Sequence, residues 1–249
     1  MTPDVVQSFA RKINRQRLRP RIWDYSYLML RKHLDVFRRF AALLPPHGLR
    51  FLDVGCGFKP WQPLVPEGTQ YFGVDYSPVW SSADALASGD ALPFPDNSFD
   101  AVICSEVLEH TRYPEAVIRE LRRVCRPGGL MYVTSPFAFV EHGAPHDFQR
   151  LTRYFYRDVF AGDEMVEFRE TNSMVSTGLT CINMAVESGP LFAANGFKHA
   201  IYVFYNLAGL AADGAIAAFA MLIPRRYRRH LGFLYTMPLG YAMIVRIQK

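Results

Sequence analysis

The sequence predicts an α/β protein with a doubly wound parallel sheet, an N-terminal basic helical region and a C-terminal helical insertion. From about Leu49 onward, short apolar runs end in Gly, Asp or Pro, which is typical of buried parallel strands. Strands that alternate with amphipathic helical segments indicate a right-handed, doubly wound sheet. With 249 residues, 50% of them hydrophobic, the chain is long enough for one large domain, and a disordered or fibrous protein is excluded.

Each element follows from its local sequence. The strands expected in the first half are Phe51–Val54, Tyr71–Val74, Ala101–Cys104 and Leu130–Thr134. A helix that begins with Pro114 and runs to Val124 is closed by Arg126-Pro-Gly-Gly, because proline and glycine mark helix starts and stops. Further along we expect a helix over Leu151–Phe160, a strand over Val166–Thr171 and a last strand over Tyr241–Ile247.

These elements divide the chain into four parts. They are a basic helical region over residues 1–47, a core over 48–172, an apolar helical insertion or cap over 173–238, and a last core strand over 239–249. The first residues lack the apolar stretch of a secretory signal, and the four cysteines show no CxxC spacing. We therefore expect a cytoplasmic protein without a disulfide framework.

Positive charge gathers near both ends of the chain. Basic side chains crowd the first fifty residues and return at Arg225, Arg226, Arg228 and Arg229. An anionic membrane surface is one partner that this charge would fit. We expect no nucleic acid, because no recognisable binding motif accompanies the charge. The sequence leaves the oligomeric state open.

A glycine turn follows the first strand in Phe51-Leu-Asp-Val-Gly-Cys-Gly. Gly55 and Gly57 let the backbone turn tightly and approach a ligand, and ligands of open parallel sheets bind at these strand ends. A dinucleotide site would need a third glycine, whereas this run continues Phe58-Lys-Pro. The carboxylate of Asp53 would suit a cationic ligand, such as a sulfonium or an ammonium, better than a pyrophosphate.

Two further acids follow later strands of the sheet. Asp75 ends the second strand, where a carboxylate can accept hydrogen bonds from a pair of ribose hydroxyls. Asp90, in Gly89-Asp-Ala-Leu, is placed to accept from an exocyclic amine. A single acid of this kind is more often a turn residue, but three acids in order with the glycine turn favour a nucleoside site.

At this point the sequence resembles the class I S-adenosylmethionine-dependent methyltransferases, in particular those of type 11. The motifs that carry the resemblance over about residues 48–136 are Leu52-Asp-Val-Gly-Cys-Gly, Gly73-Val-Asp, Gly89-Asp-Ala-Leu-Pro-Phe, Phe99-Asp-Ala-Val-Ile-Cys-Ser-Glu-Val-Leu-Glu-His and Leu121-Arg-Arg-Val-Cys-Arg-Pro-Gly-Gly. The resemblance implies a Rossmann-like, mostly parallel seven-stranded sheet that ends in an antiparallel strand pair. It also implies S-adenosylmethionine as the cofactor.

The resemblance carries over to site residues one by one. It implies that Asp53, Gly55 and Gly57 hold the methionine part of the donor and that Asp75 holds its ribose. Asp90 with Ala91 would meet the adenine, and Ser105 with Glu106 would line the methyl-donor pocket.

The acceptor side is expected in the polar and aromatic stretch after the strand Leu130–Thr134. His142 and His146 titrate near neutrality, so either could remove the proton of an acceptor hydroxyl. The competing interpretation is that they are loop residues bonded to backbone groups. We interpret His110 as structural. No His/Asp/Glu cluster shows ligand spacing along the chain, so no metal is expected.

The stretch from Ser135 to Thr152 is similar to bacterial methyltransferases associated with cell-surface glycans, through the pattern His-x-x-Pro-x-Asp-aromatic. This similarity implies methyl transfer to an oxygen of a glycan or lipid-linked saccharide. A lipophilic small molecule such as a quinone precursor is an alternative acceptor, and a non-catalytic cofactor-binding module is a rival of another class. A nicotinamide-dependent oxidoreductase is disfavoured by Asp53 and Pro60.

The apolar stretch Ala200–Ile223 has about the length that spans a bilayer. Asp213 near its centre costs about 3 kcal/mol on the insertion scale. If the strands on either side of the stretch pair in one sheet, a single crossing is impossible, so we expect the segment to fold back. It either caps the acceptor mouth or rests on a membrane surface, peripheral to its inner face.

Overall fold

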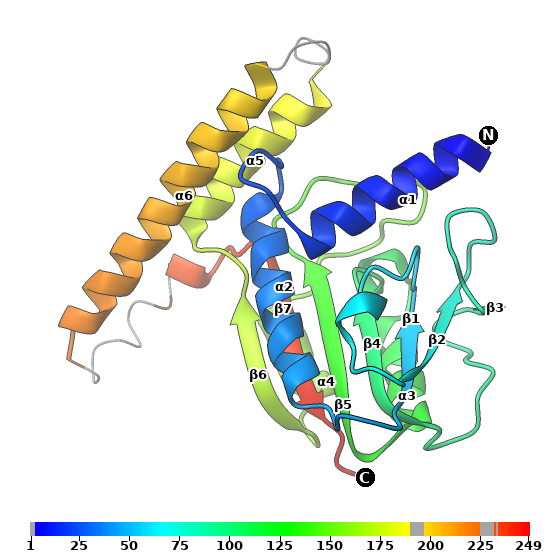
Figure 1. The fold of residues 1–249 in the computed structure, drawn as a ribbon. Helices are drawn as coiled ribbons and strands as arrows, with labels where there is room; N and C mark the ends of the chain where they lie inside the picture. Colours follow the sequence, from blue (N-terminus) through cyan, green and yellow to red (C-terminus); the bar gives the residue numbers. More distant parts are fainter. Residues whose placement is uncertain (1–2, 190–196, 225–231, 233) are drawn as a thin grey trace.

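The computed structural model describes residues 3–189, 197–224, 232 and 234–249, and its centre is a seven-stranded sheet with the order β3-β2-β1-β4-β5-β7-β6 (Figure 1). The strands are β1 Arg50–Val54, β2 Gln70–Asp75, β3 Ala85–Leu86, β4 Phe99–Ser105, β5 Cys125–Pro136, β6 Glu164–Glu170 and β7 Gly240–Arg246. β1 to β5 run parallel, and β7 pairs antiparallel with both β5 and β6. The doubly wound, mostly parallel fold is confirmed.

The strands lie within a few residues of their predicted bounds, with two differences. β3 has only two residues, too short to leave a periodic pattern in the sequence. β5 begins at Cys125, so the Arg126-Pro-Gly-Gly run is part of this strand and not a loop. The run leaves the regular ladder, since Cys125 pairs with Phe99 and Leu130 with Ala101. Gly128, with φ 74°, allows this bulge.

Helices cover both faces of the sheet. They are α1 Pro3–Leu18, α2 Tyr27–Ala42, α3 Pro114–Val124, α4 Arg153–Val159, α5 Met174–Ser188 and α6 Phe197–Leu222, with short 3₁₀ turns η1 Gln62–Leu64 and η2 Leu108–His110. Alternation along β1 sends Leu52 and Val54 to the core with α3, and Phe51 to the core with α2. In the second core the ring of Phe37 stacks on Trp61 at 4.5 Å.

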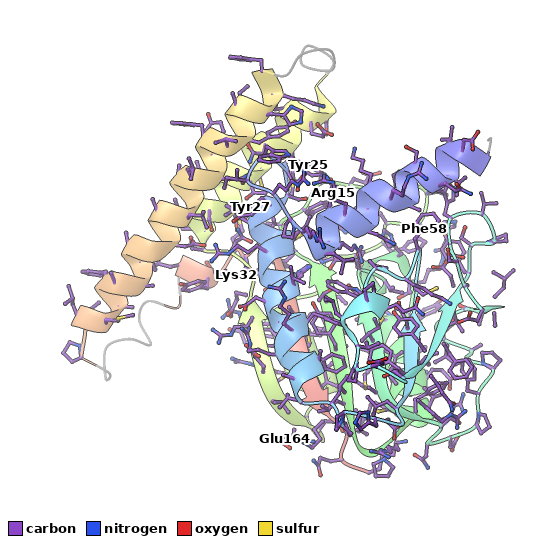
Figure 2. All side chains as sticks on the ribbon, viewed as in Figure 1. Arg15, Tyr25, Tyr27, Lys32, Phe58 and Glu164 are labelled. Atoms are coloured by element: carbon purple, nitrogen blue, oxygen red, sulfur yellow. The ribbon has the colours of Figure 1, made fainter. Side chains whose placement is uncertain are left out.

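The basic N-terminal region forms α1, which lies across the carboxyl ends of the central strands (Figure 1). Asn14 Nδ2 donates a hydrogen bond of 2.9 Å to the carbonyl of Phe58, in the loop after β1. Phe9 packs edge-on against Trp80, with ring centroids 5.3 Å apart. In Figure 2, Phe58 lies beside α1. Arg15, in the last turn of α1, forms an ion pair with Asp24 at 2.9 Å. α1 is therefore a cover over the glycine turn.

α5 and α6 form a helical hairpin that projects from one end of the sheet (Figure 1). The fully buried Asn206 of α6 donates hydrogen bonds to the carbonyls of Ile22 and Asp24, at 2.8 and 3.0 Å. The chain leaves and re-enters the sheet at one point, because the Thr171 N–H donates to the Gly240 carbonyl at 3.0 Å. The expected folding back of this segment is what the described residues show.

The outer surface of α6 is apolar. Within the described part of the chain, only α6 is long and apolar enough to cross a membrane, by length and composition alone. Core helices of soluble proteins share these properties, but only 11% of the most apolar window of α6 is buried. Arg225, Arg226, Arg228 and Arg229, expected to meet anionic headgroups, lie outside the described residues.

Candidate active site

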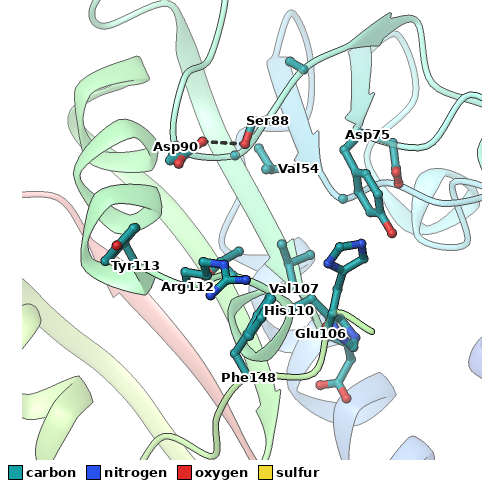
Figure 3. A pocket seen from close by; sticks show the side chains of 16 residues that line it. Val54, Asp75, Ser88, Asp90, Glu106, Val107, His110, Arg112, Tyr113 and Phe148 are labelled. Atoms are coloured by element: carbon teal, nitrogen blue, oxygen red, sulfur yellow. Dashed lines mark hydrogen bonds between the residues drawn. The ribbon is translucent and has the colours of Figure 1, made fainter. Parts of the chain in front are cut away.

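A cavity of about 470 Å³ opens at the carboxyl ends of β1, β2 and β4. Its wall comes from the glycine turn, the end of β2, residues 87–90, most of residues 106–113, and His146 and Phe148 from the loop after β5 (Figure 3). This is the sheet edge at which the sequence predicts a ligand. Among the described residues of α5 and α6 none lines the cavity, so they do not form the cap over the acceptor mouth that we considered.

The glycine turn is built by close packing and by left-handed backbone. Gly55 and Gly57 have φ values of 68° and 47°. A Cβ on Gly55 would lie 2.2 Å from Cγ2 of Val107, which also lines the cavity. The N–H of Gly55 donates to the carbonyl of Val74 at 2.9 Å, which ties the turn to β2. Only glycine meets both conditions at position 55.

The carboxylate of Asp75 is oriented by the turn. It accepts a hydrogen bond from the Gly57 N–H at 2.9 Å and another from the Ser77 N–H at 2.9 Å, one on each oxygen. The residue is 8% exposed and lines the cavity. Each oxygen keeps further acceptor capacity, so Asp75 can still accept from two hydroxyl groups of a ligand. Gly57 does not line the cavity and acts on it through this bond.

Position 73 requires glycine because Lys59 and Cys56 pack closely against it. A Cβ there would lie 2.6 Å from Cε of Lys59 and 2.8 Å from Sγ of Cys56. The Gly73 N–H and Lys59 Nζ both donate to one carboxylate oxygen of Asp84, each at 2.7 Å. Sequence analysis missed Lys59 and Asp84 as supports of the turn, because their pairing joins two loops far apart in the sequence.

Asp90 stands at the mouth of the cavity. It is exposed, and its side chain is hydrogen-bonded to the hydroxyl of Ser88, as drawn in Figure 3. Ala91 next to it is exposed and does not line the cavity; its N–H donates to the Ser88 carbonyl at 3.1 Å.

Asp53 does not face the cavity. It is 2% exposed and accepts a hydrogen bond from the hydroxyl of Tyr71, on the face of β1 opposite to Val54, which does line the cavity. Burial raises the pKa of Asp53 to about 7. The structure therefore does not place this carboxylate in contact with a ligand, in contrast to the expected neighbour of a cationic group.

This burial predicts a pH dependence of stability. The folded protein keeps the Asp53 proton up to about pH 7, whereas an unfolded chain releases it near pH 4. The contribution of this proton to the free energy of unfolding is fully present below pH 4 and is lost as the pH rises to 7. We compare the free energy of unfolding of Asp53→Asn with that of the wild type at two pH values. The difference in favour of Asp53→Asn should be about 3 kcal/mol larger at pH 8.5 than at pH 5. Urea unfolding at the two pH values measures this difference.

The exposed Asp158→Asn is the matched control and should show no such pH-dependent difference. If the difference between Asp53→Asn and the wild type is the same at both pH values, Asp53 does not hold a proton in the folded protein.

Ser105 and Glu106 follow β4 and differ in their roles. Ser105 is buried and hydrogen-bonds Thr134 through the two hydroxyls at 2.9 Å, away from the cavity. Glu106 lines the cavity with a left-handed φ of 58°, and its Oε1 is buried without a hydrogen-bond partner. Burial, reinforced by the nearby Glu109, raises the pKa of Glu106 to about 7. Non-glycine residues in this conformation gather at functional sites.

Three histidines lie in the wall of the cavity or next to it. His146 lines the cavity, with its ring edge-on to that of Tyr76 at 6.2 Å. His142 does not line the cavity, and its backbone N–H donates to the carboxylate of Asp147 at 2.9 Å. The neighbouring Glu109 carboxylate raises the pKa of His142. His110, which we interpreted as structural, also lines the cavity.

Known proteins are similar to this chain in sequence. A methyltransferase domain family matches residues 52–133. A phosphatidylethanolamine N-methyltransferase of Cereibacter sphaeroides is 30% identical over 141 residues, which cover 51% of this chain and 68% of that protein. The chain belongs to the class I S-adenosylmethionine-dependent methyltransferases.

Other relatives of this methyltransferase match over shorter segments. An uncharacterized methyltransferase of Mycobacterium leprae is 34% identical over 41% of this chain and 44% of its own length. A ubiquinone biosynthesis O-methyltransferase of Cereibacter sphaeroides is 32% identical over 43% of this chain and 49% of its own. The chain thus spans less than half the length of these two relatives.

Solved structures agree on the fold of this methyltransferase. The [4+2]-cyclase SpnF superimposes with a TM-score of 0.54 at 20% identity, over 86% of this chain and 80% of that one. A putative sarcosine dimethylglycine methyltransferase from Galdieria sulphuraria gives 0.51 at 15% identity, over 88% of each chain. Since one of these two proteins is named a cyclase, the fold does not by itself assign the reaction.

The methyltransferase cavity gathers some of the residues singled out in the sequence and not others. Those that line it are Gly55, Asp75, Asp90, Glu106 and His146, and those that do not line it are Asp53, Gly57, Ala91, Ser105 and His142. Val107 and His110 line it without having been predicted to do so. Their only signal was their place directly after a strand, within the run Ser-Glu-Val-Leu-Glu-His.

Proposed function

We propose that this methyltransferase transfers the methyl group of S-adenosylmethionine to an oxygen of a glycan or a lipid-linked saccharide. The observation that carries the proposal is one cavity with two unlike sides. Asp75 and the glycine turn make one side, and His146 and His110 make the other. The first side suits a nucleoside, and the second side offers proton acceptors for a hydroxyl group.

On the donor side, the residues that line the cavity would touch the cofactor. Gly55 receives the methionine part, Asp75 accepts from the ribose hydroxyls, Asp90 meets the adenine amine and Glu106 faces the methyl-donor pocket. The predicted residues that do not line the cavity, Asp53, Gly57, Ala91 and Ser105, then act by holding those that do. The bond from the Gly57 N–H to Asp75 is the clearest such support.

On the acceptor side, His146 is the residue we assign as the base, because it lines the cavity whereas His142 does not. The acceptor oxygen attacks the methyl carbon in line with the sulfur, the sulfur–methyl bond breaks, and S-adenosylhomocysteine leaves. The hydroxyl proton passes to His146. Orientation of the two reactants supplies most of the rate, and the proton transfer adds to it.

The donor half of the proposal is tested by calorimetric titration with S-adenosylmethionine, S-adenosylhomocysteine and NAD. We expect the first two to bind and NAD not to bind. Binding of NAD alone, or of none of the three, would contradict the donor assignment.

The acceptor half is tested by methylation assays with sugars and with isoprenoid phenols. We expect transfer to sugar hydroxyls that is lost in His146→Ala. The name of the ubiquinone biosynthesis relative favours a second candidate, a quinone precursor. Transfer to phenols and not to sugars would favour the quinone precursor as the acceptor. Binding of S-adenosylmethionine without transfer to any acceptor would indicate a non-catalytic module.

A lipid-linked acceptor would suit a membrane surface. Large apolar side chains of α6 are exposed, among them Phe204 at 65%, Phe219 at 55% and Leu222 at 83%. We therefore propose that the hairpin of α5 and α6 rests on an anionic bilayer. The positive charge that follows α6 in the sequence, at Arg225, Arg226, Arg228 and Arg229, supports this proposal.

Flotation with anionic liposomes at low salt tests this. We expect the wild type to float, and a Phe204→Glu/Leu222→Glu variant to stay in the dense fraction. Tyr154→Glu, at a side chain of α4 that is 70% exposed, is the matched control and should float. A wild type that ignores the liposomes would remove the membrane proposal.

A further inference from the structure

Three side chains with metal-ligating atoms meet beside the cavity. They are Glu109 and His110 of η2 and His142 from the loop after β5. Glu109 Oε1 lies 3.7 Å from Nε2 of His110 and 3.7 Å from Nε2 of His142. One ligand atom from each residue lies within 4.8 Å of the other two. Two ligands of a tetrahedral zinc ion are roughly 3.4 Å apart, so a small contraction brings the three into contact with one ion.

Glu109 is the feature that demands an explanation. It is 1% exposed, and neither carboxylate oxygen has a hydrogen-bond partner among the described residues. Glu106 lies close enough to interact with it electrostatically, and one of its oxygens is also buried and unpartnered. Both oxygens of Glu109 and one of Glu106 are thus buried without a donor, which is costly unless a cation compensates the charge.

Both imidazole rings are held in the orientation that ligands of a metal adopt. Nδ1 of His110 is hydrogen-bonded to the carbonyl of His146 at 2.5 Å, and Nδ1 of His142 to the carbonyl of Val140 at 3.1 Å. Because a carbonyl only accepts, each Nδ1 carries the hydrogen and each neutral ring offers the Nε2 lone pair. Histidine ligands of metals almost always donate their other N–H to a carbonyl or a carboxylate.

The loop after β5 is shaped to reach His110. Gly143 has φ 66°, and a Cβ there would lie 2.8 Å from Cε1 of His110. Position 143 therefore needs glycine both for its backbone and for this approach. Figure 3 shows His110 and Glu106 side by side at the end of the pocket away from Asp90.

We propose that Glu109, His110 and His142 bind a divalent transition-metal ion at the acceptor end of the cavity. Two imidazoles and one carboxylate suit Zn²⁺, Co²⁺ or Fe²⁺ better than Mg²⁺, and they leave coordination positions open. His110 lines the cavity, so the open positions face the space in which the acceptor would lie.

This inference rests on the proposed function for the role of the ion. An acceptor hydroxyl bound to the ion is more acidic, so its O–H bond breaks more readily and the proton passes to His146. The oxygen then forms the bond to the methyl carbon while the sulfur–methyl bond breaks. The charge of the ion does not change. His142 becomes a metal ligand and not a base.

Metal binding is measured on the full chain after treatment with EDTA and dialysis. Calorimetric titrations with ZnCl₂ and MgCl₂ should give one equivalent of Zn²⁺ and weaker binding of Mg²⁺. We expect Glu109→Gln and His142→Ala each to lose at least about tenfold in Zn²⁺ affinity. Glu141→Gln and His47→Ala, at exposed positions outside the cluster, are the matched controls and should bind as the wild type does.

A second readout does not depend on whether the variants fold. Titration of the wild type with CoCl₂ should produce the visible absorption of Co²⁺ coordinated by imidazole, and ZnCl₂ should remove it. Absence of Zn²⁺ and Co²⁺ binding by the wild type, or wild-type affinity in folded Glu109→Gln, would overturn the metal site. In that case the histidines would be protonated partners of Glu109.

Donor titration of the same samples separates the two proposals. If S-adenosylhomocysteine binds and no metal does, the metal site alone is wrong. If the metal binds and neither S-adenosylmethionine nor S-adenosylhomocysteine does, the metal site stands and the proposed function fails.

Discussion

Replacing Asp75 by alanine is expected to weaken the binding of S-adenosylmethionine about a hundredfold or more. Hydrogen bonds to a charged group contribute about 1.5–3 kcal/mol each, and two from the ribose hydroxyls together exceed the roughly 2.8 kcal/mol that a hundredfold represents. The variant also removes the acceptor of the Gly57 and Ser77 N–H groups, which loosens the turn that carries Gly55. Calorimetric titration of the variant with S-adenosylmethionine and S-adenosylhomocysteine measures the loss.

Asp75→Asn separates the two contributions, because it keeps the shape of the side chain and loses its charge. Asp158→Ala, on the exposed surface of α4, is the control for a lost carboxylate and should bind the donor normally. If Asp75→Ala keeps wild-type affinity, the ribose is held elsewhere and the donor orientation that we propose is wrong.

Replacing Gly55 by alanine is expected to cost about 2–5 kcal/mol of unfolding free energy. Left-handed backbone costs an alanine about 1–2 kcal/mol, and forcing a methyl group into packed surroundings costs a further 1–3 kcal/mol or so. The added Cβ would lie 2.2 Å from Cγ2 of Val107, so one of the two must move. Because both residues line the cavity, we also expect loss of donor binding.

Two further variants isolate the steric part of this effect. Gly48→Ala adds a Cβ at a similar φ of 72° with no atom within 4 Å, so it should show the backbone cost alone. Val107→Ala combined with Gly55→Ala removes the clash and should recover part of the stability. Urea unfolding of the four proteins gives the comparison, and equal losses for Gly55→Ala and Gly48→Ala would mean that Val107 yields without cost.

The cavity wall around the glycine turn could be predicted from the sequence because its determinants are local. A buried strand followed by glycines gives a turn at the sheet edge, and the acid at the end of the next strand reaches the same edge. Gly55 and Asp75 therefore lie where the pattern places them. Asp53 does not, although the alternation of side chains along β1 already assigns it to the face opposite Val54.

The cluster of Glu109, His110 and His142 beside the cavity could not be predicted in the same way, because it forms only when the loop after β5 folds back onto η2. Glu109 and His110 are adjacent in sequence, but His142 joins them only through the path of the loop after β5. That path depends on Gly143 and on the contact of Arg150 with Asp147, at 2.8 Å, within the same loop. The spacing of these residues in the sequence therefore does not predict that their side chains lie close together.

The hairpin of α5 and α6 leaves and re-enters the sheet where Thr171 meets Gly240, two residues joined by three hydrogen bonds. Its removal would leave two strand ends already side by side, which a short turn could join. A segment attached in this way can be gained, lost or replaced in evolution while the donor chemistry stays intact.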